Sequence, residues 1–383
     1  MPACQGCTVL DVGAGSGLLS IMAARLGAKN VIAIEANPDL AQLARRTIER
    51  NELEANVTVF ASLSSQVEAD LFPEGQRADL LVTETFGTML LGEGSMNFVP
   101  DARDRLLKEG GTIIPAGGCQ YATLVEVPEM MPVWSPAGWG GFNLSRLEVL
   151  QDTVYWKAMV GANSLEYVRL SDRICVLEVD LYRDTMESVP KNRTFRLQAK
   201  RKGTVHAVLF DWDIWVDRER SQVLSTEPGS RNFAGDVAWG WLLQLQEVAG
   251  QDWKLGQHPS QLLVEADDWL ELGVEYIAKG ISMHARVRPV EASEGSVVQE
   301  GAMPQVGSPP RIHTVDRRGM KEANEFFLPV AGDTERHDFY AAALKDAVKQ
   351  LKPKSSPATL LDLSGNAGVP AFLAAKELGM KSM

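Results

Sequence analysis

The first 120 residues alternate short apolar runs with segments of helical periodicity, and this alternation most restricts the folds open to the chain. The apolar runs are TVLDV, NVIAIEA, NVTVFA and ADLLVTE. Helical periodicity appears in GLLSIMAARLG and PDLAQLARRTIERNE, and FVPDARDRLLKEGGTIIP reads as a helix that leads into a further strand. Such alternation is typical of a parallel sheet with helices on both faces, so we predict a Rossmann-like domain over residues 1–120.

The pattern changes near Tyr121, where strand-like runs joined by turns replace the alternation. The runs are ICVLEVDLY, RTFRLQAKRKG, HAVLFDWDIWVD, QLLVEADD and EYIAKGISMHARV. This succession predicts an antiparallel β-barrel domain over residues 121–289. Residues 290–311 are rich in Gly, Ser and Pro and indicate a linker.

The end of the chain repeats the pattern of its beginning. The segment PATLLDLSGNAGVPAFLAAKELG matches the first strand and helix at a constant offset, at Leu10/Leu361, Asp11/Asp362, Gly17/Gly368, Ala23/Ala374 and Ala24/Ala375. We therefore predict the truncated start of a second, degenerate Rossmann-like module over residues 312–383. Ser364 and Asn366 replace two glycines of the first copy, so the second copy is predicted to bind no cofactor.

Composition restricts the partners and the compartment. The 383 residues carry a net charge of −12, which disfavours nonspecific nucleic-acid binding and is compatible with basic protein partners or simply with solubility. No apolar run is long enough for a membrane-spanning helix. Four cysteines do not suggest a disulfide framework in a chain of this length, so we expect a reducing compartment. Cys4 and Cys7 lack a second pair or histidines at zinc-ligand spacing, so no metal site is predicted.

A glycine-rich loop, LDVGAGSG, follows the first strand and opens a helix. The spacing of Gly13, Gly15 and Gly17 differs from the GxGxxG fingerprint of dinucleotide-binding domains. Asp11 lies at the strand end, where a carboxylate suits a cationic ligand better than a pyrophosphate. Glu35 ends the second strand and is placed to accept hydrogen bonds from two ribose hydroxyls. These features favour S-adenosylmethionine over NAD, and a turn without any ligand remains the plain structural alternative.

Two glutamates bracket a short apolar turn, TETFGTMLLGEG, after the run ADLLV. Glu84 and Glu93 would be costly at the edge of a buried sheet unless a cation meets them. A guanidinium is planar, always charged and binds carboxylates bidentately, so two glutamates could hold one arginine and turn a terminal nitrogen toward a methyl donor. Either glutamate alone reads as a helix cap or a solvated loop residue.

The segments VLDVGAGSGLLSIMAARLGAKNVIAIEAN and TETFGTMLLGEGSM together resemble the protein arginine N-methyltransferases, whose hairpin carries two glutamates at this spacing. The hairpin and the degenerate repeat resemble most the member of the family that has two tandem modules. The resemblance implies that the substrate arginine is held by Glu84 and Glu93, and that the methyl donor is held by Asp11, Gly13, Gly15, Gly17 and Glu35. It also implies that the β-barrel domain over residues 121–289 binds the substrate. Monomethylarginine as the product, a pseudo-dimer of the two modules, and a cytoplasmic and nuclear location are implied as well. Basic or Gly/Arg-rich protein segments, such as histones or RNA-binding proteins, are the implied substrates.

The chain departs from this family at three points. The family has an N-terminal lid helix upstream of the position at which this chain begins. Gln66 stands where the family has an adenine-contacting glutamate, which predicts weakened rather than lost binding. In DVAWGW, Ala238 replaces a pocket histidine and Trp239 is kept as a substrate-pocket residue. These departures leave open an incomplete or noncatalytic homologue that binds arginine-rich segments, whereas a small-molecule methyltransferase is disfavoured by the hairpin and the added β domain.

Overall fold

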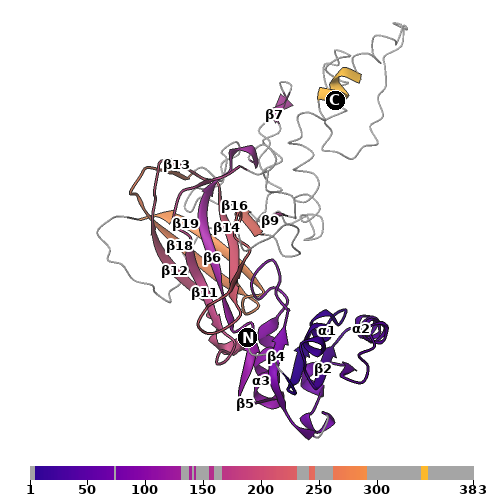
Figure 1. The fold of residues 1–383 in the computed structure, drawn as a ribbon. Coiled ribbons are helices and arrows are strands. Elements are labelled where there is room, and N and C mark those ends of the chain that lie inside the picture. Colours follow the sequence, from indigo (N-terminus) through magenta and orange to yellow (C-terminus); the bar gives the residue numbers. More distant parts are fainter. Residues whose placement is uncertain are drawn as a thin grey trace, which may run out of the picture.

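A computed structural model describes residues 5–72, 75–130, 138–139, 142–143, 155–158, 166–230, 241–245, 262–290 and 338–343 (Figure 1). Ala238, Trp239 and Cys4 lie outside these ranges, as do nearly all of the predicted linker and all but six residues of the predicted second module. Within the described part of the chain, no helix has the length and apolar character required to cross a membrane. The same residues contain no group of three or more potential metal ligands.

The first part of the chain forms a five-stranded parallel sheet in the order β3-β2-β1-β4-β5. The strands are β1 (Thr8–Val12), β2 (Asn30–Glu35), β3 (Val57–Ala61), β4 (Ala78–Thr83) and β5 (Leu107–Ile114). The helices are α1 (Leu18–Arg25), α2 (Pro38–Arg50) and α3 (Val99–Leu106). The predicted Rossmann-like alternation is confirmed, and the chain order reverses between β1 and β4, which is where ligands bind in sheets of this kind.

Alternating side chains of the central strands determine which helix covers which face. Val9 of β1 belongs to a buried cluster with side chains of α1 and α2, whereas Leu10 belongs to the cluster that includes α3. Successive residues of a strand point to opposite faces, so a parallel sheet covered on both sides needs apolar residues at every position. Asn37 caps the N-terminus of α2, because its side-chain oxygen accepts hydrogen bonds from the amides of Asp39 and Leu40, and Pro38 begins the helix.

The second part of the chain is antiparallel and β-barrel-like. The larger sheet has seven strands, built on the path β10-β6-β14-β16-β9 with β11 beside β6 and β15 beside β14. Its strands are β6 (Gly117–Glu126), β9 (Tyr155–Ala158), β10 (Val168–Arg169), β11 (Ile174–Asp180), β14 (Ala207–Trp215), β15 (Val223–Ser225) and β16 (Trp241–Leu245). A three-stranded sheet holds β12 (Asn192–Gln198), β18 (Trp269–Ile277) and β19 (Ser282–Pro289). Two short pairs complete the described strands, β13 (Gly203–Val205) with β17 (Leu262–Val264) and β7 (Gly138–Trp139) with β8 (Phe142–Asn143).

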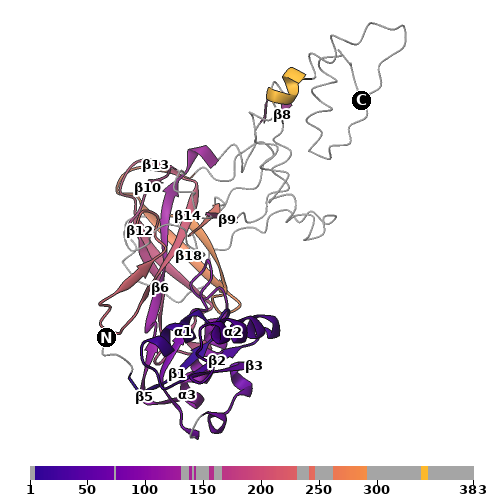
Figure 2. The same cartoon turned by 45° about the vertical axis from the view of Figure 1, so that its right-hand side comes forward.

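A buried glutamine side chain joins the two larger antiparallel sheets. Gln244 on β16 donates a hydrogen bond to the carbonyl of Ala285 on β19 at 2.8 Å and accepts one from the Ala285 amide at 2.7 Å. The side-chain amide thus satisfies both backbone groups of Ala285, as a neighbouring strand would. The antiparallel strands lie above the parallel sheet in both views, offset to the left in Figure 1 (Figures 1 and 2). One apolar cluster runs from Leu10 through Leu91 to Phe210.

One strand prediction needs correction. The run EYIAKGISMHARV is not a single strand but the hairpin of β18 and β19, whose last pair is Ile277 and Ser282. Ala278, Lys279 and Gly280 all have positive φ angles, of 48°, 61° and 87°. A positive φ is sterically unfavourable for alanine and lysine, which are not the residues expected in such a turn. The apolar side chains alternate on both sides of the turn, so the run resembles one continuous strand in the sequence.

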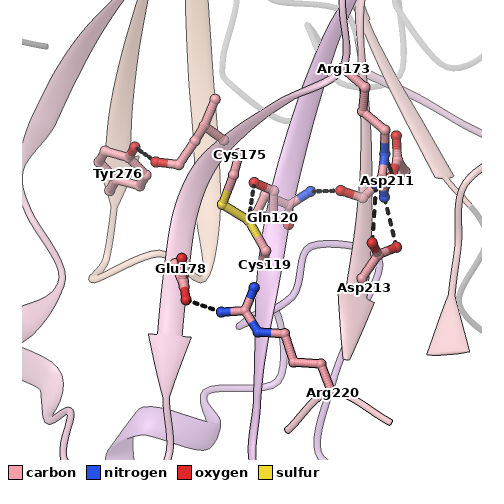
Figure 3. The surroundings of a disulfide bond; sticks show 10 residues. Cys119, Gln120, Arg173, Cys175, Glu178, Asp211, Asp213, Arg220 and Tyr276 are labelled. Atoms are coloured by element: carbon pink, nitrogen blue, oxygen red, sulfur yellow. Dashed lines mark hydrogen bonds and ion pairs between the residues drawn. A yellow bond between two sulfur atoms is a disulfide. The ribbon is translucent and has the colours of Figure 1, made fainter. Parts of the chain in front are cut away.

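The cysteine prediction also needs correction. Cys119 on β6 and Cys175 on β11 form a disulfide, with Cα atoms 6.0 Å apart (Figure 3). The two strands pair antiparallel with an irregularity between Cys175 and Leu177, which brings the two cysteines within the range that a disulfide requires. A count of cysteines did not reveal this pairing, because the two cysteines are 56 positions apart and only the β6–β11 ladder brings them together.

Candidate functional site

Three glycines in the left-handed backbone conformation shape the glycine loop after β1. Gly13, Gly15 and Gly17 have φ angles of 80°, 52° and 84°. The amides of Gly13 and Ala14 both donate to the carbonyl of Ile34, at 2.9 and 3.0 Å, which turns the loop back toward the end of β2. A Cβ on Gly17 would lie 3.4 Å from the Ala44 Cβ, an ordinary contact, so the left-handed backbone rather than the packing against α2 favours glycine here.

Gly15 has a different environment. Among the described residues, no atom lies within 4 Å of a Cβ built on Gly15. Its amide donates to the Glu35 Oε2 at 2.8 Å, and the other oxygen of Glu35 accepts from the Asn37 amide at 2.7 Å. A carboxylate can accept about four hydrogen bonds, so Glu35 keeps acceptor capacity for ligand hydroxyls. The structure therefore places Gly15 and Glu35 together, as the sequence predicts.

Asp11 lies beneath this loop and is fully buried. Its Oδ2 accepts a hydrogen bond from the Ser20 hydroxyl of α1 at 2.6 Å, whereas its Oδ1 has no partner among the described residues. Burial raises the pKa of Asp11 to about 6, partly offset by the hydrogen bonds from Ser20. A buried acceptor without a donor fits a cationic or hydrogen-bonding ligand near the loop, so these residues fit S-adenosylmethionine.

The loop after β4 lies against the glycine loop. A Cβ on Gly13 would lie 2.6 Å from the Thr85 Cγ2, and the Thr83 hydroxyl donates to the Val12 carbonyl at 2.7 Å. The hydroxyls of Thr83 and Thr85 are 3.0 Å apart. Glu84, the first predicted catalytic residue, lies between these two threonines. It therefore stands at the carboxyl ends of the neighbouring strands β1 and β4. Sequence reasoning did not single out Thr83, Thr85 or Ser20, since a lone hydroxyl carries no pattern.

The apolar side chains between the two glutamates are buried, whereas the glutamates themselves are exposed. Glu84 and Glu93 are exposed, and Met89, Leu90 and Leu91 between them are at most 5% exposed. Three apolar side chains thus fix the loop in the core, and its two acidic ends remain accessible.

Gln66 lies on the segment after β3 rather than on either loop. It is exposed, in the short helix Ser64–Gln66. Arg105 of α3 holds this segment, donating to the carbonyls of Ser64 and Val67 at 2.9 Å each. Of the predicted site, the structure thus brings Asp11, the glycines, Glu35 and the loop of Glu84 together, and Trp239 lies outside the described residues.

Relatives of this chain are methyltransferases. Residues 3–121 match the family model "Ribosomal protein L11 methyltransferase (PrmA)". "Arginine N(omega)-methyltransferase" from Streptomyces achromogenes subsp. streptozoticus is 30% identical over 239 residues, which cover 62% of this chain and 63% of that protein. "Protein arginine N-methyltransferase 7" from Drosophila melanogaster is 28% identical over 292 residues, covering 72% of this chain and 39% of that protein. In sequence, this chain is thus similar to arginine methyltransferases over 62% to 72% of its length.

The fold agrees with this relationship. The PRMT1 enzyme–prozyme heterotetrameric complex of Trypanosoma brucei, solved with AdoHcy, superposes with a TM-score of 0.57 at 19% identity and covers 77% of this chain and 87% of that chain. Matches named protein arginine N-methyltransferase 7 agree with the resemblance carried by the hairpin. The chain spans 63% and 39% of the lengths of the two curated relatives described above, which is less than two thirds of either.

Proposed function

We propose that this chain is an S-adenosylmethionine-dependent protein arginine N-methyltransferase that forms monomethylarginine. The contact between Gly13 and Thr85 carries the proposal, because it places the glycine loop and the first of two exposed glutamates at one edge of the parallel sheet. The similarity to arginine methyltransferases supports both the reaction and the acceptor group.

Asp11, Gly15 and Glu35 would hold the cofactor. Glu35 would accept hydrogen bonds from the ribose hydroxyls, and the open side of Gly15 would let the ligand approach the backbone closely. The unpaired oxygen of Asp11 lies beneath the same loop. When bound, S-adenosylmethionine supplies a methyl group activated by a positively charged sulphur.

Glu84 and Glu93 would bind the substrate arginine through paired hydrogen bonds from its guanidinium group. Two carboxylates restrict rotation of the guanidinium plane, direct one terminal nitrogen and stabilise positive charge on the remaining nitrogens. Either carboxylate can then accept the proton that the methylated nitrogen must lose. The protein thus contributes position and charge, and monomethylation would follow if the pocket has no room for a second orientation of the methylated nitrogen.

The first test is titration calorimetry with S-adenosylmethionine, on the chain and on Glu35→Ala. We expect binding by the chain and none by the variant. Methyl transfer to a Gly/Arg-rich peptide is then measured by mass for the chain, Glu84→Gln, Glu93→Gln and the control Glu109→Gln, an exposed glutamate on β5. Each site variant should lose activity by about 10²-fold or more, and the control should lose none.

Two other readings give different results in the same assays. Binding without transfer by a folded chain would favour a noncatalytic homologue that holds arginine-rich segments. The name of the Streptomyces relative favours arginine itself as a second candidate substrate, so free L-arginine is assayed beside the peptide. Faster transfer to the free amino acid would contradict the proposal of a protein substrate, and a dimethylated product would contradict monomethylation.

A further inference from the structure

The loop between the two glutamates is bound by two side chains of the antiparallel sheet. Gln120 on β6 and Trp212 on β14 are directly opposite each other in the β6–β14 pairing, and both are fully buried. The Trp212 indole Nε1 donates to the Gly87 carbonyl at 2.9 Å. The Gln120 Oε1 accepts from the Leu90 amide at 2.7 Å.

Gln120 is itself held in place. Its side-chain nitrogen donates to the Asp211 carbonyl at 2.8 Å, so the amide bridges β14 and the loop (Figure 3). The Trp212 ring packs near Phe86, with ring centroids 6.1 Å apart. The backbone amide of Trp212 donates to the Thr226 hydroxyl at 2.8 Å. Both anchors therefore belong to the rigid sheet, not to the loop that they bind.

The two bonds are placed symmetrically with respect to the glutamates. Gly87 is three residues after Glu84, and Leu90 is three residues before Glu93. Between the two glutamates the loop folds back on itself, because a Cβ on Gly87 would lie 3.1 Å from the Gly92 Cα. The two hydrogen bonds therefore hold the loop at Gly87 and Leu90, each three residues from a glutamate.

The tip of the β18–β19 hairpin supports the loop from another side. Gly280 has a φ of +87°, and a Cβ there would lie 3.0 Å from the Leu91 Cδ1. A Cβ on Gly94 would lie 3.9 Å from the Ile281 Cδ1. Elements of both antiparallel sheets thus contact the loop, and none of these contacts involves a glutamate side chain.

We infer that Gln120 and Trp212 are positioning residues for arginine methylation, which set the separation and direction of Glu84 and Glu93. The inference rests on the proposed function. Bidentate binding of a guanidinium by two carboxylates depends on placement to a fraction of an ångström, and a shift of 1 Å at a reacting group can lower a rate by about 10²-fold. Loss of either side chain would also leave the Leu90 amide or the Gly87 carbonyl without this hydrogen bond, which favours a shift of the loop toward another partner.

The test compares matched substitutions. Gln120→Met and Trp212→Phe remove the hydrogen-bonding atoms and keep much of the apolar volume. Gln244→Met removes a buried glutamine that bridges the two larger antiparallel sheets and does not contact the loop through the hydrogen bonds described above. Trp215→Phe changes a second tryptophan of β14, which packs with Ala116 and Cys119. For each protein, kcat, the KM for an arginine peptide, the Kd for S-adenosylmethionine and the melting temperature are measured.

A positioning role predicts a specific split among these quantities. Gln120→Met and Trp212→Phe should lower kcat by 10- to 100-fold and leave the cofactor Kd within twofold. The two control variants should lower the melting temperature about as much as the anchor variants do. Their kcat, normalised to the concentration of protein that binds cofactor, should stay within about twofold of that of the unmodified chain. Hydrogen exchange at the Leu90 amide should accelerate in Gln120→Met but not in Gln244→Met.

Two results would overturn the inference in distinguishable ways. If the kcat values of the anchor variants fall no further than those of the controls, the residues only stabilise the fold, and the positioning role is wrong while the proposed function stands. If the unmodified chain transfers no methyl group although it is folded, the proposed function fails and the positioning role fails with it. If Gln120→Met does not fold, Trp212→Phe decides the question, because it keeps an aromatic ring at the same place and removes the N–H.

Discussion

Gly13 and Thr85 approach so closely that a Cβ on the glycine would lie 2.6 Å from the Thr85 Cγ2. This contact joins the loop after β1 to the loop after β4, and Glu84 is the residue next to Thr85. Only glycine at position 13 allows both the contact and the φ of +80°. The candidate cofactor loop and the candidate arginine-binding loop therefore depend on each other for their positions.

Gly13→Ala should lower stability by about 2–4 kcal/mol, because it adds a steric clash to the cost of a left-handed backbone. Gly6→Ala is the matched control, since Gly6 has the same φ of +80° and none of the described atoms lies within 4 Å of a Cβ there. Urea denaturation measures both, and calorimetry measures S-adenosylmethionine binding. Equal losses of stability in the two variants would show that the contact with Thr85 is unimportant.

Asp11→Asn should increase stability at neutral pH. Burial raises the pKa of Asp11 from 3.8 to about 6, so between these pH values the folded chain keeps a proton that the unfolded chain has lost. The Asp11 contribution to stability therefore falls as the pH rises through this window and stays level above it. Compared with the unmodified chain, the variant should gain about 3 kcal/mol between pH 3 and pH 7.

Urea denaturation at several pH values checks this expectation. Asp79→Asn serves as a control of opposite sign. Burial alone would raise the pKa of Asp79, but hydrogen bonds from the Lys108 side chain and the Thr8 amide lower it. Its removal should therefore cost stability near neutral pH and cost less in acid. A difference between Asp11→Asn and the unmodified chain that does not change with pH would contradict the raised pKa.

Replacement of Cys119 and Cys175 by alanine and serine should lower the free energy of unfolding by about 2–4 kcal/mol, because the crosslink closes a loop of 56 residues. Dithiothreitol should lower the melting temperature of the unmodified chain toward that of the double variant and leave the variant unchanged. Titration of thiols before and after reduction checks that the disulfide is present. A melting temperature insensitive to the reductant in both proteins would refute its contribution.

Arg173→Met should destabilise the chain by about 3–5 kcal/mol at neutral pH. Arg173 donates to the Asp211 Oδ1 from Nε at 2.8 Å and to Asp213 from Nη1 at 3.0 Å, and its guanidinium lies 3.4 Å from the centre of the Tyr121 ring (Figure 3). Removal of the arginine leaves the carboxylate of Asp211 buried without a counter-charge.

The double variant Arg173→Met/Asp211→Leu is the control for this prediction. It removes both charges of the buried pair, so much of the lost stability should return. Thermal denaturation of the single and double variants, with double-mutant analysis, gives the coupling between the two residues. A double variant as unstable as the sum of the two single variants would mean that the charges do not interact.

Local sequence patterns were sufficient for the parallel sheet and for the candidate residues on it. Strand–helix alternation predicts β1 to β5 because the period of apolar residues depends on the element itself and on no distant partner. Gly13, Gly15 and Glu35 could be proposed for the same reason, since the end of each strand can be located in the sequence and parallel strands end at one edge.

Contacts between distant segments could be decided only by the tertiary structure. The turn at Ala278–Ile281, the Cys119–Cys175 disulfide and the hydrogen bonds of Gln120 and Trp212 to the loop all depend on which strands become neighbours. The sequence by itself determined the chemical groups available, two glutamates and a glycine loop, because these are properties of residues and of short spacings. Only the packing of β6 and β14 against the loop decided how the glutamates are held, because hydrogen-bond geometry between residues 30 or 125 positions apart arises only once the chain has folded.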